Sequence, residues 1–264
     1  MSHDIGEMYR SDEYISKNPG LFSLDSPWKV KQAWPYVEEA VLRLNKPAIT
    51  LLDVGGGAGE ILRLVSERIT QKLGVQVRKY IVDLSPGILE MQRKVNSDVV
   101  LSLNEDIAHT SLTEKEVDLA LLFDLLEHVR EPVAALHEVR RVSRWALFKV
   151  PLEDNLYFNL LNLKTRGRFR QKLAEDLGHI NVYTYAELKR QVEANNGKVV
   201  MSGYTNAYTQ FLESPAYKLG VFHRMVNRLA ACLYPLSPTL CARVFNDFIM
   251  LLVDCDGSLV GGSQ

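Results

Sequence analysis

A glycine-rich segment carries the clearest chemical signal in this sequence of 264 residues. Residues 53–59 read Asp-Val-Gly-Gly-Gly-Ala-Gly. Glycine accepts positive φ angles and lets a ligand approach the backbone closely, and the free N–H groups at the start of the next helix bind an anion such as a carboxylate. Asp53 stands two residues before the first glycine, where its charge would repel a pyrophosphate and attract a cation. The segment therefore predicts a site for a zwitterion that carries both an ammonium and a carboxylate.

A nicotinamide dinucleotide is the alternative ligand for such a loop. Its fingerprint, G-x-G-x-x-G/A, requires a small residue at the sixth position. Counted from Gly55 the sixth position is Glu60, and counted from Gly57 it is Leu62. Because both counts fail, the sequence disfavours a nicotinamide site.

Three further polar segments each follow a short apolar run. Asp83 ends the run 79–83, where a carboxylate can accept both ribose hydroxyls of a nucleoside; a plain helix-capping acid is the alternative. In residues 104–107, Asn-Glu-Asp-Ile, an acid or amide can accept from an exocyclic adenine amine while Ile107 packs on the ring; the alternative is an ordinary polar loop. Residues 123–129, Phe-Asp-Leu-Leu-Glu-His-Val, end the fourth run.

Alternating strands and helices are needed to bring these segments together. Such alternation predicts a parallel sheet with helices on both faces, and ligands bind such sheets outside the carboxyl ends of the strands. Pro35 is expected to bend or interrupt the first helix. Strands are predicted at 48–54, 79–83, 98–103, 117–123, 145–150, 198–204 and 248–255, and helices at 30–44, 60–72, 87–95, 131–142 and 184–195.

The order of these motifs resembles that of a known enzyme family, the class I S-adenosylmethionine-dependent methyltransferases. The likeness is greatest to the small-molecule branch that includes the ubiquinone-biosynthesis O-methyltransferases, with a methyltransferase type 11 domain. It runs from about residue 50 to residue 150 and, more loosely, through 178–184. The segments that carry it are LLDVGGGAGE at 51–60, IVDLS at 81–85, NEDI at 104–107 and DLALLFDLLEHV at 118–129.

This resemblance implies a fold, a cofactor and a set of binding residues. The fold is α/β: a Rossmann-like, doubly wound sheet of seven strands whose last strand is antiparallel. The cofactor is S-adenosyl-L-methionine, with no metal; the glycine loop would cradle its methionine part, Asp83 would bind its ribose and Asp106 would reach its adenine. The expected cofactor-binding residues are Asp53, Gly55, Gly56, Gly57, Gly59, Asp83, Leu84, Glu105, Asp106, Ile107, Phe123 and Asp124.

The expected domain organisation is a core with three additions. Residues 1–46 are an N-terminal helical lid, and residues 47–205 and 247–256 form the S-adenosylmethionine-binding core. Residues 153–178 form a basic insertion within that core, and residues 206–246 form a helical cap. A tight turn would suffice between the last two strands, so the cap is expected to cover the acceptor pocket; a dimer interface is the alternative, and the chain is expected to be a monomer or a homodimer.

Two histidines are candidate catalytic bases. Methyl transfer requires alignment of the acceptor, exclusion of water and, for a hydroxyl acceptor, removal of a proton, and histidine suits that task near neutral pH. His128 follows the fourth strand and His179 follows the insertion; a structural role is the alternative for each. The expected reaction is methylation of a small-molecule or of a lipid- or glycan-precursor acceptor, with oxygen favoured over nitrogen and carbon. A non-catalytic protein that binds the cofactor for regulation or with a partner is the second hypothesis.

The basic insertion has three interpretations. Residues 155–172 contain five Lys or Arg residues and no acid. In the first, they form a solvated helix face. In the second, they bind an anionic or lipid-linked acceptor. In the third, they make peripheral contact with an anionic membrane, helped by the apolar stretch 156–163. The cap adds positive charge, so an acceptor with an apolar body and an acidic or phosphorylated end is expected.

Composition and charge limit the remaining possibilities. Lys and Arg total 31 against 32 Asp and Glu, a net charge of -1, so nucleic acid is not an expected partner. The first twenty residues are too charged for a signal peptide, and no stretch approaches the roughly 20 apolar residues of a membrane span. Three cysteines without paired spacing predict free, buried thiols in a reducing compartment, and so a cytoplasmic protein.

Overall fold

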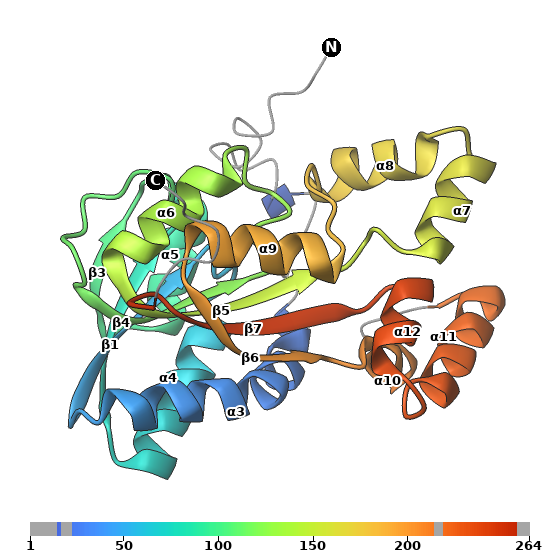
Figure 1. Ribbon diagram of the computed structural model, residues 1–264. Coiled ribbons are helices and arrows are strands. Elements are labelled where there is room, and N and C mark those ends of the chain that lie inside the picture. The colour runs from blue at the N-terminus through green and yellow to red at the C-terminus, as the bar shows by residue number, and fades with distance from the viewer. Residues whose placement is uncertain (1–14, 17–22, 214–218, 258–264) are drawn as a thin grey trace.

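One seven-stranded sheet organises the described part of the chain, which comprises residues 15–16, 23–213 and 219–257 of the computed structural model (Figure 1). Its order is β3-β2-β1-β4-β5-β7-β6, and β7 runs antiparallel to β5 and β6. The predicted doubly wound sheet with an antiparallel last strand is therefore confirmed. The strands are β1 (Ala48–Val54), β2 (Gln76–Val82), β3 (Val99–Leu103), β4 (Val117–Phe123), β5 (Ser143–Pro151), β6 (Lys198–Tyr204) and β7 (Phe248–Asp254).

Helices cover both faces of this sheet because the central strands are apolar on both sides. In β4, Leu119 and Leu121 pack on the side of α3 and α4, whereas Ala120 and Leu122 pack on the side of α6 and α9. Among the described residues, no helix combines the length and the apolar character needed to cross a membrane. The helices are α3 (Ser26–Leu44), α4 (Glu60–Leu73), α5 (Pro86–Val95), α6 (Pro132–Val142), α7 (Leu156–Lys164), α8 (Arg168–Leu177), α9 (Tyr185–Asn195), α10 (Ala207–Glu213), α11 (Val221–Leu233) and α12 (Pro238–Val244), with a short 3₁₀ helix, η1 (Ser23–Asp25).

Local sequence signals explain where several helices begin. Ser85 caps α5, its Oγ accepting from the backbone N–H of Ile88 at 3.2 Å, as the sequence predicts. Thr184 and Glu187 form a reciprocal capping box at the start of α9. These caps satisfy N–H groups that have no partner within the helix.

The first long helix differs from the sequence-based expectation. It begins at Ser26 and not at residue 30, and it continues through Pro35 to Leu44 without interruption. Pro27 suits the first turn of a helix, where its missing N–H is not needed. Pro35 cannot donate a backbone hydrogen bond within the helix. Packing offsets this loss of stability, because Val37 and the rest of one helix face are buried against α4 and the sheet.

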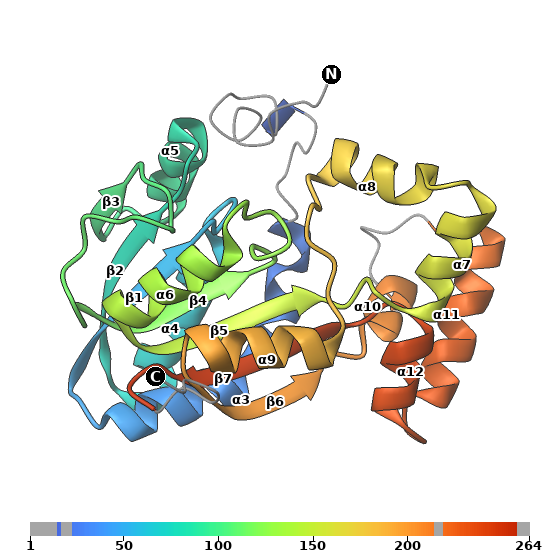
Figure 2. The ribbon, with the colours of Figure 1, turned by 45° about the horizontal axis from the view of Figure 1, so that its top comes forward.

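Two helical insertions leave the sheet at the same end. α7 and α8 follow β5, and α10, α11 and α12 lie between β6 and β7. Since β7 alone is antiparallel, its amino end lies beside the carboxyl ends of its neighbours. Both insertions therefore stand beyond the carboxyl ends of the strands, as Figures 1 and 2 show.

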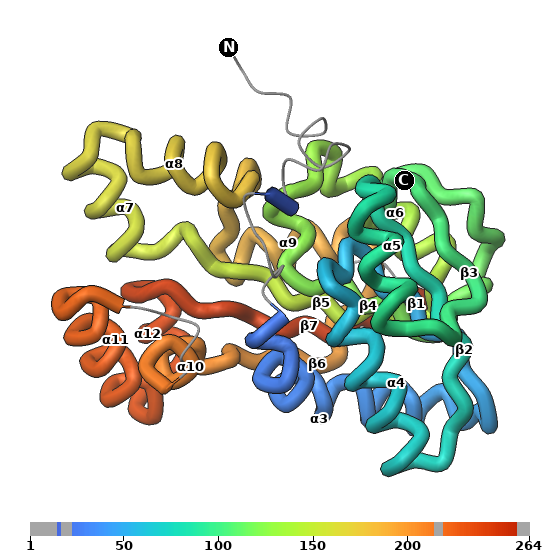
Figure 3. Tube along the Cα trace, turned by 180° about the vertical axis from the view of Figure 1, so that it is seen from behind, coloured from blue at the N-terminus to red at the C-terminus, as the bar shows by residue number. Residues whose placement is uncertain are grey.

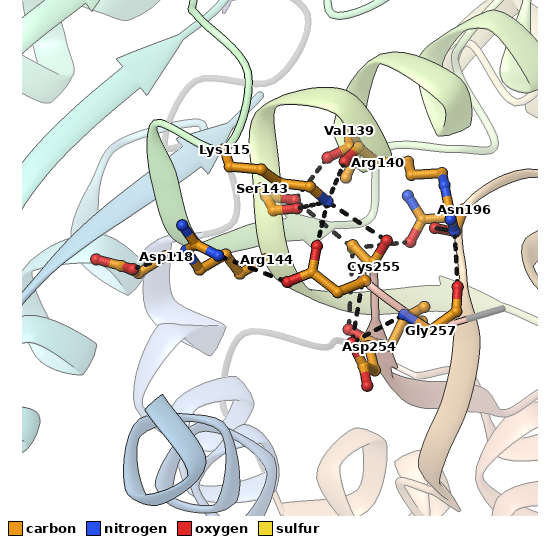
Figure 4. A network of polar contacts seen from close by, with 12 residues as sticks. Lys115, Asp118, Val139, Arg140, Ser143, Arg144, Asn196, Asp254, Cys255 and Gly257 are labelled. Atoms are coloured by element: carbon orange, nitrogen blue, oxygen red, sulfur yellow. Dashed lines mark hydrogen bonds and ion pairs between the residues drawn. The ribbon is translucent and has the colours of Figure 1, made fainter. Parts of the chain in front are cut away.

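A polar network ties the strands together at their opposite end (Figure 4). The Nζ of Lys115 donates to the carbonyls of Ser143 and Cys255 at 3.1 and 3.4 Å. Arg140 donates to the carbonyl of Asn196 at 3.0 Å. These bonds join the loop before β4 to the start of β5 and to the end of β7, at the end of the sheet opposite the helical insertions.

The three cysteines are free thiols, as predicted. Cys241 and Cys255 are buried, and the Cys255 thiol donates to Oδ1 of Asn196 at 3.3 Å. Cys232 is exposed, so the expectation that all three are buried is wrong. The reason is that α11 turns most of its surface to solvent.

We expect α3 to behave as a core helix and not as a detachable lid. Trp34→Ala should lower the free energy of unfolding by about 3 kcal/mol, because the indole is 9% exposed and the Arg68 guanidinium lies 4.5 Å from the centre of its ring. Leu42→Ala, on the solvent side of the same helix, should change it by less than about 0.5 kcal/mol. Urea unfolding of the two variants makes the comparison, and equal small losses would contradict the packing described here.

Candidate active site

A cavity of about 580 Å³ opens at the carboxyl ends of the parallel strands. Its walls come from the loops after β1, β2, β3, β4 and β5 and from the first turn of α3. Most of the predicted cofactor-binding residues line it. They are Gly55, Gly56, Gly57, Asp83, Leu84, Glu105, Asp106, Ile107, Phe123 and Asp124.

The glycine loop forms one wall of the cavity with its backbone. Gly55 and Gly57 have φ angles of 63° and 55°, which disfavour residues with a Cβ. A Cβ on Gly55 would lie 2.7 Å from Cδ1 of Leu125, and one on Gly56 would overlap the Asp53 carboxylate. The loop must therefore remain glycine to present bare backbone to the cavity.

Two of the predicted binding residues stand behind the loop and do not line the cavity. Gly59 caps α4 with a φ of 83°, and its carbonyl accepts from Nδ2 of Asn96 at 2.9 Å. Asp53 is 1% exposed, and its Oδ2 has no hydrogen-bond partner in the described structure. Burial and the nearby charge of Asp83 raise the pKa of Asp53 to about 7.

Asp83 brings a second buried carboxylate to the same corner. Its Oδ1 accepts from the backbone N–H of Ser85 at 2.8 Å. Burial raises the pKa of Asp83 to about 7, although the backbone N–H groups of Ser85 and Leu84 oppose that rise. The corner thus holds two acids whose negative charge the chain itself does not compensate, an arrangement that favours ligands with positive charge or hydroxyl donors.

The loop after β3 carries the residues that are predicted to contact adenine. Ile107 is 6% exposed and lines the cavity beside Asp106. Both acids of this loop already accept backbone hydrogen bonds: Asp106 from Ala108 at 2.9 Å and Glu105 from Ser111 at 2.7 Å. Those bonds fix the loop and leave each carboxylate a second oxygen as an acceptor.

A cluster of paired ions, with Lys149 buried and Asp124 partly exposed, lies at the ends of β4 and β5. Asp124 is in contact with the Nζ of Lys149, and its Oδ2 lies 2.7 Å from the Nζ of Lys29 in α3. Burial alone would raise the pKa of Asp124, but the charges of Lys149 and Lys29 outweigh it and hold that pKa below its usual range. Burial lowers the pKa of Lys149 to about 8 despite Asp124. The Lys149 ammonium also lies over the ring of Phe248, 3.4 Å from its centre.

Glu127 is buried beside this cluster without a lysine of its own. It is 1% exposed, and neither carboxyl oxygen has a hydrogen-bond partner in the part of the chain described. Burial, and then the charge of Asp124, raise the pKa of Glu127 well above its usual range. Burial therefore disfavours the ionised form of this carboxyl group.

The two candidate bases lie together but differ in their partners. The rings of His128 and His179 stand edge to face with centres 4.8 Å apart. Nδ1 of His128 lies 3.1 Å from the carbonyl of Gly178, so it must donate. Nδ1 of His179 lies 2.7 Å from Oε1 of Glu153, which is 5% exposed. Burial and the proximity of His179 lower the pKa of His128 to about 3, so His128 holds a proton poorly on Nε2.

Backbone hydrogen bonds explain how His179, which follows the insertion, reaches this site. The N–H groups of Ile180 and Asn181 donate to the Glu127 carbonyl at 2.9 and 3.0 Å. The Asn181 side chain donates to the carbonyls of Leu126 and Val129 at 2.9 and 2.6 Å. The chain after α8 is thereby fixed to the loop after β4, and His179 is carried into the cavity wall.

Glu127, His128 and His179 also form a set of metal-ligand types. One ligand atom from each lies within 4.8 Å of the others. Two imidazoles and a carboxylate suit a divalent transition metal. Metal-bound histidines commonly donate their other ring N–H to a carboxylate, and His179 donates to Glu153 in this way. The resemblance implied no metal, and Glu127 is not among the predicted site residues.

The insertions contribute apolar side chains to the cavity, not basic ones. Phe158 of α7, Leu177 at the end of α8 and Phe211 of α10 line it, whereas none of the basic residues in 164–172 does. The acidic or phosphorylated end expected of the acceptor therefore finds no partner from that run among the lining residues. Within the segment 206–246, α10 and the approach to β7 line the cavity, whereas no residue of α11 or α12 does.

Four residues of the site were missed by the sequence analysis: Lys29, Glu127, Lys149 and Glu153. A lysine at position 149 inside the apolar run 145–150 was a usable signal. Parallel pairing sets Phe123 opposite Lys149, so the residue after Phe123, Asp124, is its natural partner. Glu153 gave no such signal, since only the folded chain brings it to His179.

The residues present fit S-adenosylmethionine. The glycine cradle, which side chains would fill, can hold the methionine backbone, and the uncompensated acids at 53 and 83 match its positive charge and its ribose hydroxyls. Ile107 offers an apolar surface to the adenine. When bound, the cofactor supplies a methyl group on a positively charged sulfur that is already a good leaving group.

Comparison with known proteins agrees with this assignment. Residues 30–201 match the family model described as a methyltransferase domain. No curated protein matches the chain in sequence.

Solved structures share the fold at low sequence identity. Geranyl diphosphate C-methyltransferase from Streptomyces coelicolor A3(2), in complex with Mg2+, geranyl diphosphate and S-adenosyl-L-homocysteine, is 13% identical, with a TM-score of 0.57 over 83% of this chain and 77% of that one. The cyclopropane synthase MmaA2 from Mycobacterium tuberculosis is 13% identical, with a TM-score of 0.52 over 82% of each chain. The [4+2]-cyclase SpnF is 13% identical, with a TM-score of 0.53 over 90% of this chain and 94% of that one. These likenesses show the fold.

The uncompensated charge of Asp83 gives a prediction that couples stability to binding. Its pKa rises on folding from 3.8 to about 7, so the folded chain loses stability as the pH rises through that window and the carboxyl ionises. Asp83→Asn keeps an oxygen for the Ser85 N–H and carries no charge. The variant should therefore be more stable than the parent chain at pH 8, by up to about 4 kcal/mol, and equal to it near pH 4.

Affinity for S-adenosylmethionine should change in the opposite direction. Asp83→Asn should weaken binding by about 1–3 kcal/mol, because the carboxylate loses its charge and one acceptor. Urea unfolding at the two pH values and titration calorimetry at pH 8 measure the two effects. A stability difference that is the same at both pH values would show that ionisation of Asp83 is not its cause.

Proposed function

The chain belongs to the methyltransferase domain family and is an S-adenosylmethionine-dependent enzyme, and from that premise we propose that it methylates a hydroxyl oxygen of an acceptor with an apolar body. The observation that carries this proposal is the pair His179–Glu153, with 2.7 Å between Nδ1 and Oε1, at the wall of the cavity. A neutral hydroxyl is a poor nucleophile until a base takes its proton, whereas a neutral amine attacks with its own lone pair.

His179 has the arrangement of a general base. A carboxylate only accepts, so Nδ1 carries the proton and Nε2 keeps its lone pair. Glu153 fixes this tautomer and stabilises the positive charge that forms when Nε2 takes a proton from the acceptor. His128 is the poorer base because the pKa of its ring falls to about 3, and its role is to pack against His179 and to hold the Gly178 carbonyl.

The remaining residues bind, align and exclude water. The glycine loop and Asp83 hold the cofactor, and Asp124, held between two lysines, fixes the loop that carries Glu127 and His128. Phe158 and Phe211 close the acceptor side with apolar surface. Exclusion of water protects the methyl group from hydrolysis and strengthens the electrostatic contacts within the site.

The acceptor class follows from the same walls. The side chains beyond the ion cluster are mainly apolar, and the basic run 164–172 does not reach them, so recognition of the acceptor body is apolar. The related fold of a geranyl diphosphate methyltransferase supports an acceptor with a hydrocarbon chain. Methylation of oxygen distinguishes the proposal from the carbon methylation named for that enzyme.

Labelled S-adenosylmethionine tests the reaction directly. The protein is incubated with methyl-labelled cofactor and a cell extract, and the extract is then partitioned into organic solvent. Label should enter the organic phase as a methyl ether identified by mass spectrometry. Label on nitrogen or carbon alone would exclude O-methylation, and label in protein or nucleic acid would exclude the acceptor class.

Variants at His179 and Glu153 test the base once the acceptor is isolated. His179→Ala should lower kcat by about 10²–10⁴-fold with an unchanged Kd for the cofactor. Glu153→Gln should lower kcat without raising KM, because the imidazolium that forms on His179 loses its anionic partner. His128→Ala should lower the free energy of unfolding, and it should lower kcat less than His179→Ala does.

A chelator separates the base from the metal alternative. If His179 acts as a base, EDTA leaves kcat unchanged. Loss of activity with EDTA and recovery with a divalent cation would instead assign Nε2 of His179 to a metal held with Glu127 and His128, and the base would have to be sought elsewhere.

A further inference from the structure

Exposed apolar side chains are concentrated at one end of the molecule. Fourteen large apolar residues are exposed in the described structure, and ten of them lie in α7, in α11 or in the stretch from α11 through α12. None of the ten lines the cavity, so the acceptor does not cover them. They are Leu156, Leu160, Leu163, Val221, Phe222, Met225, Leu229, Leu233, Leu236 and Leu240.

These side chains belong to helices that pack against one another, and the exposed parts of α7, α11 and α12 are here called the apolar end. α11 packs against α10 and α12, and α12 packs against α7. Figures 1 and 3 show the same helices together beyond the edge of the sheet from opposite sides. On α11, Phe222, Met225, Leu229 and Leu233 recur at intervals of three and four residues, which places them on one side of the helix.

Positive charge surrounds the apolar end and negative charge is absent from its segments. Residues 155–174 and 219–246 contain no Asp or Glu. Six exposed Lys and Arg side chains in these segments form no salt bridge with a residue that the structure describes, whereas the exposed Lys172 pairs with Asp176. The six are Lys164, Arg166, Arg168, Arg224, Arg228 and Arg243.

We propose that the apolar end docks on the surface of an anionic lipid bilayer, with α11 lying in the interface. An amphipathic helix buries its apolar face among the headgroups and the first acyl carbons, and basic side chains beside it attract anionic lipid. A protein partner would need acidic groups distributed to match six arginines and lysines, whereas an anionic bilayer offers a uniform negative plane beside an apolar one.

Docking in this orientation places the cavity close to lipid. α7 and α10 contribute Phe158 and Phe211 to the cavity wall, and both helices pack against elements of the apolar end. An apolar acceptor would then reach the cavity from the bilayer without crossing water. The docking itself does not depend on the methyl-transfer proposal.

Vesicle sedimentation tests the docking without cofactor or acceptor. The full chain is mixed with vesicles of phosphatidylcholine alone or of phosphatidylcholine with phosphatidylglycerol, at low and at high salt. It should sediment with the vesicles that contain phosphatidylglycerol, and high salt should weaken that binding because the charges are exposed. No sedimentation, or equal sedimentation with both vesicles, would overturn the proposal.

Two combined variants separate the apolar and the charged contributions. Phe222→Asp with Met225→Asp and Leu229→Asp should lower vesicle binding at least about tenfold, because three inserted side chains become anionic. Arg224→Ser with Arg228→Ser should lower it by about fivefold for each arginine removed, and only for anionic vesicles. All five positions are exposed, so the fold is retained.

The matched control carries the same chemistry elsewhere on the surface. Leu42→Asp in α3 and Val133→Asp in α6 replace exposed apolar residues, 60% and 43% exposed, outside the apolar end. This control should bind vesicles like the parent chain, and equal losses in both sets would overturn the proposal. Sedimentation velocity gives the remaining outcome. If the parent chain is a dimer, the Asp variant of α11 is a monomer and neither binds vesicles, the surface is an interface with a second copy of the chain.

Discussion

The ion pairs of Asp124 with Lys149 and with Lys29 are the interactions on which the rest of the site depends. Lys149 comes from β5, Lys29 from α3 and Asp124 from the end of β4, so one carboxylate joins three elements. Asp124 also takes a φ of 52° and donates its N–H to the Lys149 carbonyl at 2.8 Å. The chain therefore turns sharply there and presents Glu127 and His128 to the cavity. An apolar residue at 149 would leave the partly buried carboxylate with Lys29 as its one lysine partner in the described structure, which is costly.

Charge elsewhere in the cavity is left without compensation. Asp53, Asp83 and Glu127 all have raised pKa values because they are buried with too few partners. Such groups reduce the stability of the folded chain, and they cluster where a ligand supplies the missing partners. The site thus combines one fully paired carboxylate that fixes geometry with three poorly paired ones that favour a cationic, hydroxyl-bearing cofactor.

The two insertions divide their side chains between two tasks. Both leave the sheet at the carboxyl ends of the strands, because β7 is antiparallel and returns to that end. Their inner residues, such as Phe158 and Phe211, close the cavity, whereas Leu160 and Met225 face outward. An antiparallel last strand therefore lets the chain place a cap beside the site without altering the sheet.

The sequence by itself determined the sheet, the glycine loop and Asp83, because these depend on short-range patterns: apolar runs, glycines at fixed spacing and an acid at a strand end. Only the tertiary structure decided which charges meet. Asp124 and Lys149 are 25 residues apart, and Glu153 and His179 are 26 apart; the first contact needs strand pairing and the second needs the loop after α8 to be fixed to the loop after β4. The structure also decided that α11 faces solvent. A sequence pattern shows that a helix has an apolar face, but the neighbours that bury it or leave it exposed are set by packing over the whole fold.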